Sequence, residues 1–92
     1  MLELKIVQRG RRINLSPHQY AFHLKHAALG CPSYILVQYH PKGTTKPAEI
    51  ELRLYSGSQA AEILEKGIET APIVSYPLSA VDWPDLANRL AQ

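Results

Sequence analysis

A helix whose two ends are both marked in the sequence is the feature that most constrains the fold of this chain. Its start is a Ser-Pro-His-Gln run, in which Ser16 is the expected N-cap, Pro17 occupies the first helical position and Gln19 completes a capping box. Its end is Gly30, which supplies the left-handed residue that closes many helices, and the Cys-Pro that follows stops the helix. We therefore expect one helix to run from Pro17 to Leu29.

Two segments with the pattern of β-strands flank this helix. Residues 2–7 alternate apolar and polar side chains, which predicts a strand with Leu2, Leu4 and Ile6 facing the core. Residues 33–40 contain a short apolar run, which is typical of a strand in the middle of a sheet. The first 40 residues thus predict a strand, a helix and a second strand.

Two further strands are expected in the second half of the chain. Residues 49–55 alternate strictly, which predicts a half-exposed strand in a hairpin with residues 33–40, with Tyr55 and the charged side chains pointing outward. Residues 73–76 are short and apolar and fit an edge strand.

Two more helices complete the expected set. One begins after the Ser-Gly-Ser-Gln run, buries Ile63 and Leu64 and ends at Gly67. The other is capped by Asp82, and Trp83 is expected to pack it against the sheet. The order is therefore β-α-β-β-α-(β)-α, and it predicts an α/β fold in which helices flank a small mixed sheet.

Composition limits the class of protein. A chain of 92 residues is enough for a single domain, residues 1–92. The single cysteine, Cys31, excludes a disulfide framework and a multi-cysteine zinc site. No apolar run reaches the ~18 residues of a membrane span, and the first residues lack the order of a signal peptide. We therefore expect a protein of the reducing cytoplasm with no membrane partner.

The cations are concentrated in the N-terminal half of the sequence. The net charge is only +2, but residues 1–46 carry seven lysines and arginines against one acid, and residues 47–92 carry three against seven. This distribution indicates that the N-terminal half meets a polyanion, unless the division of the sequence has no counterpart on the surface.

Glu3 and Lys5 form the first candidate site. They lie two residues apart on a predicted strand, so their side chains leave the same face of the sheet. A carboxylate is a hard oxygen ligand that suits Mg²⁺, and a lysine beside it can stabilise a developing anion or orient an attacking water. The simpler alternative is an exposed ion pair on a strand.

The succession of elements that begins with Glu3 resembles the second half of the PD-(D/E)XK nuclease superfamily. The resemblance is to the small virus-type replication-repair nuclease (VRR-NUC) domains and the Holliday-junction resolvases. In these proteins a strand with Glu-x-Lys leads through a loop to a helix introduced by a Leu-Ser-Pro-x-Gln-like signature, and then to an apolar strand preceded by glycine. The resemblance covers residues 2–55 and implies a restriction-endonuclease-like core without its N-terminal part.

The resemblance also implies an activity and the residues that perform it. Glu3 would be a metal ligand, Lys5 the catalytic lysine, and Gln19 an auxiliary polar residue of the site, in competition with its role in the capping box. The implied enzyme is a DNA endonuclease that uses Mg²⁺, with Mn²⁺ as a substitute. The family pattern includes an acidic residue on an upstream strand, which we expect to come from a partner chain or from a separate piece of the gene, unless catalysis has been lost.

Basic side chains near this site are the predicted DNA contacts. A basic turn centred on Gly10 is suited to hold a phosphate backbone, and the alternative is a turn that serves solubility. The predicted contacts are Arg9, Arg11, Arg12, Lys25 and Lys42. His23 and His26 share a helix face, but no third metal ligand has a suitable spacing, so we expect a solvated or DNA-facing surface there.

Two other classes of function remain open. The chain could be a nucleic-acid-binding module without catalysis, or a small interaction protein that docks a partner through an exposed 49–55 strand or its acidic half. An N-terminal strand with an open edge also predicts a two-fold homodimer. The first strand, or the 33–40 and 49–55 strands, would lie at its interface.

Overall fold

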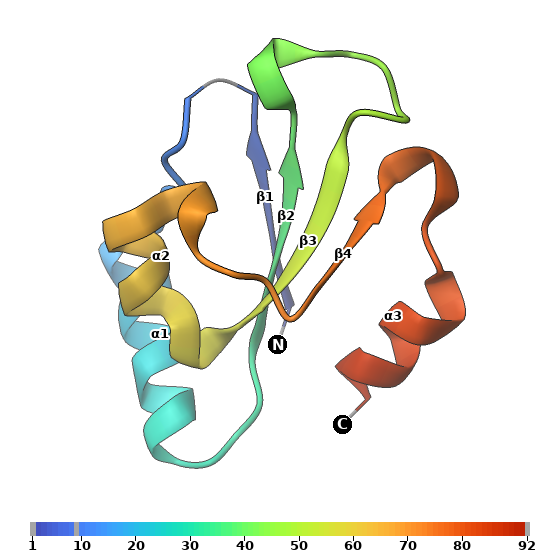
Figure 1. The fold of residues 1–92 in the computed structure, drawn as a ribbon. Helices are drawn as coiled ribbons and strands as arrows, with labels where there is room; N and C mark the ends of the chain where they lie inside the picture. Colours follow the sequence, from blue (N-terminus) through green and yellow to red (C-terminus); the bar gives the residue numbers. More distant parts are fainter. Residues whose placement is uncertain (1, 9, 92) are drawn as a thin grey trace.

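The strands form one mixed sheet in the computed structural model, which describes residues 2–8 and 10–91. In sequence order and also across the sheet, the strands are β1 (Leu2–Val7), β2 (Tyr34–Tyr39), β3 (Glu51–Ser56) and β4 (Val74–Pro77). β1 pairs with β2 in parallel, and the other two pairings are antiparallel. The predicted mixed α/β fold is therefore confirmed, including the pairing of β2 with β3 (Figure 1).

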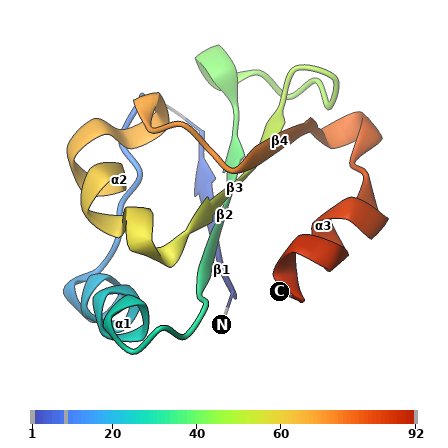
Figure 2. The same cartoon turned by 60° about the horizontal axis from the view of Figure 1, so that its bottom comes forward.

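Within these residues the helices are α1 (Pro17–Ala28), α2 (Ala60–Lys66) and α3 (Trp83–Leu90). α1 and α2 lie on one side of the sheet and α3 lies on the other, as Figure 2 shows. α1 is the crossover between the parallel strands β1 and β2, which is the usual way to join two such strands. None of the helices described is long and apolar enough to cross a membrane.

The start of α1 follows from its capping residues. The Ser16 hydroxyl accepts a hydrogen bond from the amide of Gln19 at 3.2 Å, and the Gln19 side-chain oxygen accepts from the amide of Ser16 at 3.0 Å. The helix ends at Ala28, one residue before the predicted end, with Leu29 as its C-cap, and Gly30 follows with φ of +72°. The predicted start of this helix is confirmed and its predicted end is correct to within one residue, because the signals that set them are local.

Each face of the sheet has its own apolar core. Towards α1 and α2 the buried side chains are Val7, Ile13, Ile35, Val37, Tyr55 and Ile63. Towards α3 they are Leu36, Leu52, Leu54, Tyr76 and Leu86. β2 and β3 contribute to both cores, which explains the apolar run in β2.

The predicted orientation of β1 is wrong. Leu2, Leu4 and Ile6 are 45%, 59% and 56% exposed, whereas Glu3 is only 8% exposed. α1 covers the face of β1 that carries Glu3, while the core beneath α3 is built from β2, β3 and β4. This polar face can be buried because α1 supplies His23 as a polar partner for Glu3.

The predicted outward orientation of Tyr55 in the third strand is also wrong. Tyr55 is fully buried, and its hydroxyl donates to the carbonyl oxygen of Thr70 at 3.1 Å. β3 lies between β2 and β4 and has helices on both sides of the sheet, so neither of its faces is free. It therefore does not form the exposed docking strand considered above.

Two predicted helix contacts are wrong as well. Leu64 is exposed, whereas Ile63 beside it is fully buried. Trp83 is exposed, and Leu86 packs α3 against the sheet instead. Adjacent helix residues point about 100° apart, so the face that is buried depends on how the helix docks and not on the hydrophobicity of one residue.

Candidate functional site

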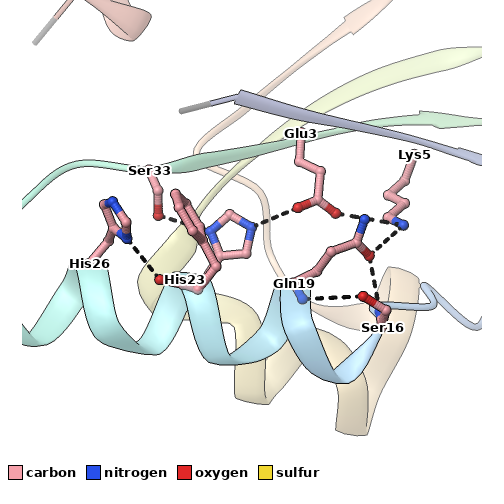
Figure 3. A network of polar contacts seen from close by, with 8 residues as sticks. Glu3, Lys5, Ser16, Gln19, His23, His26 and Ser33 are labelled. Atoms are coloured by element: carbon pink, nitrogen blue, oxygen red, sulfur yellow. Dashed lines mark hydrogen bonds and ion pairs between the residues drawn. The ribbon is translucent and has the colours of Figure 1, made fainter.

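The candidate site lies between β1 and α1, whose polar residues have matching spacings. Gln19 and His23 are four residues apart on the helix, a rise of about 6 Å. Glu3 and Lys5 are two residues apart on the strand, a rise of about 6.6 Å. The four side chains therefore meet in two pairs, Lys5 with Gln19 and Glu3 with His23, as Figure 3 shows.

The Lys5 end of this row is the end nearest to solvent. Lys5 Nζ donates to Gln19 Oε1 at 2.7 Å and lies 3.6 Å from Glu3 Oε2, and its side chain is 25% exposed. Gln19 Oε1 also accepts the amide of Ser16 in the capping box. The side-chain oxygen of Gln19 thus serves both the helix cap and the contact with Lys5. These two roles were expected to compete, and the structure fills both.

Glu3 is a buried carboxylate with one oxygen that lacks a hydrogen bond. Its Oε1 lies 3.3 Å from His23 Nε2. Its Oε2 has the ion pair with Lys5, but no hydrogen-bond partner in the part of the chain that the structure describes. Burying a carboxylate is costly unless charged and polar groups compensate it, so Lys5 and His23 are what allow this position.

His23 connects Glu3 to the second strand. It is fully buried, and its Nδ1 lies 2.9 Å from the hydroxyl oxygen of Ser33. A carboxylate can only accept hydrogen bonds, so a neutral imidazole satisfies both contacts when Nε2 donates to Glu3 and Nδ1 accepts from the Ser33 hydroxyl. The expectation that His23 lies on a solvated or DNA-facing surface is therefore wrong.

The row of Ser33, His23 and Glu3 has the residue types of a hydrolase triad but not its accessibility. Ser33 is buried, and its carbonyl oxygen accepts the amide of Gly57 at 2.7 Å. A Cβ atom added at Gly57 would stand 1.9 Å from the Ser33 hydroxyl oxygen. The hydroxyl is thus covered by backbone, and it orients His23 rather than attacking a substrate.

The site between β1 and α1 supplies one carboxylate, that of Glu3, for a metal ion. The described residues contain no group of three or more His, Cys, Asp or Glu side chains that could hold one. His26 stacks on Phe22 and does not join His23. Mg²⁺ is usually bound through one or two carboxylates together with water and substrate phosphates. Glu3 Oε2 is a hard oxygen donor without a hydrogen bond, but it is buried and ion-paired with Lys5 in this structure. It fits one ligand position only if the contact between β1 and α1 opens to admit the ion, and the remaining ligands have to come from elsewhere.

The predicted DNA contacts lie in three places. The turn after β1 and the loop after β2 are neighbours at one end of the sheet, because the amide of His40 donates to the carbonyl oxygen of Val7 at 2.9 Å. Arg11 and Arg12 belong to this turn and Lys42 to this loop, and all three are exposed, whereas Arg9 lies outside the described residues. Lys25 lies in the last turn of α1, towards the opposite end.

Arg11 is already paired. Its guanidinium donates to Glu69 at 2.7 Å in an exposed ion pair. This contact joins the basic and the acidic half of the sequence. The division of charge along the chain is therefore partly cancelled on the surface.

Comparison of the chain with protein-family models, curated proteins and solved structures finds no match. The relation to PD-(D/E)XK nucleases accordingly remains a prediction from the sequence. The function has to be argued from the site itself.

Proposed function

We propose that this chain contributes part of a metal-dependent nuclease site that hydrolyses phosphodiester bonds in DNA. The observation that carries the proposal is the meeting of Glu3, Lys5 and Gln19, with a 2.7 Å contact between side chains 14 residues apart. These are the residues to which the resemblance assigns the site. Their convergence supports the proposal because the three side chains come from two separate elements, β1 and α1, and meet as the resemblance implies for the site.

The chain's own residues have distinct roles in this proposal. Glu3 Oε2 is the metal ligand, and the contact between Glu3 Oε1 and His23 fixes the orientation of the carboxylate. Gln19 holds the ammonium group of Lys5, so that its charge is in place for a phosphate oxygen before DNA arrives. Mg²⁺, or Mn²⁺ in its place, supplies charge stabilisation and an acidified water when it is bound.

The site needs a second carboxylate, and we propose that a partner chain provides it. The basic turn and loop at the end of β1 and β2 supply the contacts with the DNA backbone, with Arg12 and Lys42 as exposed examples. The free, exposed thiol of Cys31 fits the reducing cytoplasm that we propose as the compartment.

The second candidate is a nucleic-acid-binding module without catalysis. The observation that favours it is that the described residues contain no group of three or more His, Cys, Asp or Glu side chains that could hold a metal ion. In that case Glu3 and His23 only hold α1 on the sheet, and the basic turn and loop bind DNA without cleaving it.

A cleavage assay on branched, duplex and single-stranded DNA with Mg²⁺ or Mn²⁺ tests the proposal. Glu3→Gln keeps an acceptor for His23 but removes the metal ligand, and Glu65→Gln, at an exposed position of α2, is the matched control. We expect metal-dependent cleavage that Glu3→Gln abolishes and Glu65→Gln retains. Cleavage that Glu3→Gln leaves intact contradicts the assignment of the site.

DNA binding in the same samples distinguishes the second candidate. Affinity should fall with salt, with a log–log slope of about −0.9 per phosphate neutralised. The double variant Arg11→Ala/Arg12→Ala should flatten this slope by up to about 2. Salt-dependent binding without cleavage under any condition favours the non-catalytic module, and no binding at low salt contradicts both candidates.

A further inference from the structure

The outer edge of β1 is open in the part of the chain that the structure describes. β1 is the terminal strand of the sheet and pairs only with β2. On the face towards α3 it carries three exposed apolar side chains, Leu2, Leu4 and Ile6. Natural edge strands are usually protected by charged side chains, bulges or covering elements, and β1 has no such protection on this face.

The unpaired backbone groups belong to the same three residues. The carbonyl oxygen of Val7 accepts from His40, directly after β2, so the peptide groups of Val7 face β2. Peptide groups point alternately to the two sides of a strand. The N–H and C=O groups of Leu2, Leu4 and Ile6 therefore face away from the sheet. These residues offer both backbone pairing and apolar contact to an incoming strand.

We propose that β1 pairs in antiparallel fashion with β1 of a second copy of this chain, around a two-fold axis at Leu4. In this register Leu4 lies opposite Leu4 of the second copy, and Leu2 lies opposite its Ile6. On the other face Glu3 lies opposite the second copy's Lys5, and Lys5 opposite its Glu3. Apolar residues meet apolar ones and the acid meets the base, which is favourable for directly opposed residues in a sheet.

The charges select this register over its neighbours. An axis at Glu3 would oppose two carboxylates, and an axis at Lys5 would oppose two ammonium groups, both of which are destabilising. Only an axis at Leu4 opposes Glu3 with Lys5. A second copy of the chain is therefore the partner whose pattern of charge matches this edge.

The proposed pairing depends only on the properties of the β1 edge, whereas the following consequence depends on the proposed function. In this register the Glu3 residues of the two copies are diagonal neighbours, about 7–8 Å apart. The second copy would then supply the carboxylate that the site of one chain lacks. The dimer buries little beyond one strand pair, so we expect dissociation in the micromolar range.

Two measurements without DNA or metal test the pairing, so its failure is separate from a failure of the nuclease proposal. The first is sedimentation equilibrium from about 1 to 100 µM on wild type, Leu4→Lys and Leu24→Lys. Leu24 is also exposed but lies on α1, so it controls for the loss of a surface leucine. We expect dimers for wild type and Leu24→Lys, and at least a tenfold weaker association for Leu4→Lys.

The second measurement is disulfide trapping in a Cys31→Ser background. Opposed, hydrogen-bonded residues have Cα atoms about 5.5 Å apart, which lies within the range of disulfides. Leu4→Cys should give a covalent dimer on mild oxidation, and Leu24→Cys should not. This variant stays informative even if Leu4→Lys fails to fold. A wild-type monomer throughout the concentration range, a dimer that Leu4→Lys leaves intact, or no trapping at Leu4→Cys would each overturn the proposal.

Discussion

Replacing His23 with leucine tests whether the polar row between β1 and α1 stabilises the fold. Leucine is close to histidine in volume, so the fully buried position stays filled and the cost comes from polar partners that are left unpaired. The Ser33 hydroxyl loses its contact at 2.9 Å, which costs about 1 kcal/mol, and the Glu3 carboxylate loses its contact at 3.3 Å, which costs about 2 kcal/mol. We therefore expect the free energy of unfolding to fall by about 3 kcal/mol.

Equilibrium unfolding in urea, followed by circular dichroism, measures this loss. In a domain of this size about 3 kcal/mol corresponds to a decrease in the melting temperature of about 15 °C. His26→Leu is the matched control, because His26 is half-buried on the same helix, where its ring hydrogen-bonds to the carbonyl oxygen of Phe22 and stacks on the Phe22 ring. It should cost less than about 1 kcal/mol.

A double variant separates unpaired polar groups from other causes. Glu3→Met together with His23→Leu replaces both members of the pair by apolar side chains, which is often close to neutral. We expect this double variant to be more stable than His23→Leu alone. If His23→Leu unfolds at the same urea concentration as wild type, the polar row contributes nothing to stability and the reasoning fails.

Three further predictions concern single positions. Ser16→Ala should lower the free energy of unfolding by about 1 kcal/mol through loss of the cap of α1, as measured in urea. Gly57→Ala should lower the melting temperature by an amount equivalent to about 1–3 kcal/mol or more, because the added Cβ meets a buried hydroxyl; unchanged melting would contradict the packing described here. The pKa of Asp85 lies below its usual range because the hydroxyl of Tyr76 donates to the carboxylate at 2.6 Å and Arg89 donates at 2.9 Å. The contribution of Asp85 is therefore complete above the unfolded pKa of about 3.9 and is lost as pH falls through the lower folded value. Melting curves from pH 7 to pH 2 should show a smaller acid-dependent decrease for Asp85→Asn than for wild type.

The sequence predicts α1 well because each of its signals acts within one turn of helix. Ser16, Gln19 and Gly30 determine hydrogen bonds to their own neighbours, whatever the rest of the chain does. The alternation in β1 shows that its two faces differ, but not which face the helix covers. That choice depends on the polar partners on α1, and the usual assumption that apolar side chains face inward gives the wrong orientation for Leu4.

The site was predictable only where its signals come from residues that are close in the sequence. The common face of Glu3 and Lys5 follows from the period of a strand, and the place of Gln19 follows from the resemblance to the nucleases. The contact of His23 with Glu3 spans 20 residues and was missed. The signal that could have found it is the four-residue spacing of Gln19 and His23, which matches the two-residue spacing on the strand.

The central claim is that Glu3 Oε2, a buried carboxylate oxygen without a hydrogen bond, binds a divalent cation beside Lys5 and Gln19. Titration of ¹⁵N-labelled protein with Mn²⁺ tests this claim most directly, because bound Mn²⁺ broadens the NMR signals of nearby amides. We predict broadening centred on the amides of Glu3, Lys5 and Gln19, reversed by excess Mg²⁺ and absent in Glu3→Gln. Broadening centred elsewhere in the chain, or broadening that Glu3→Gln leaves unchanged, would contradict the account.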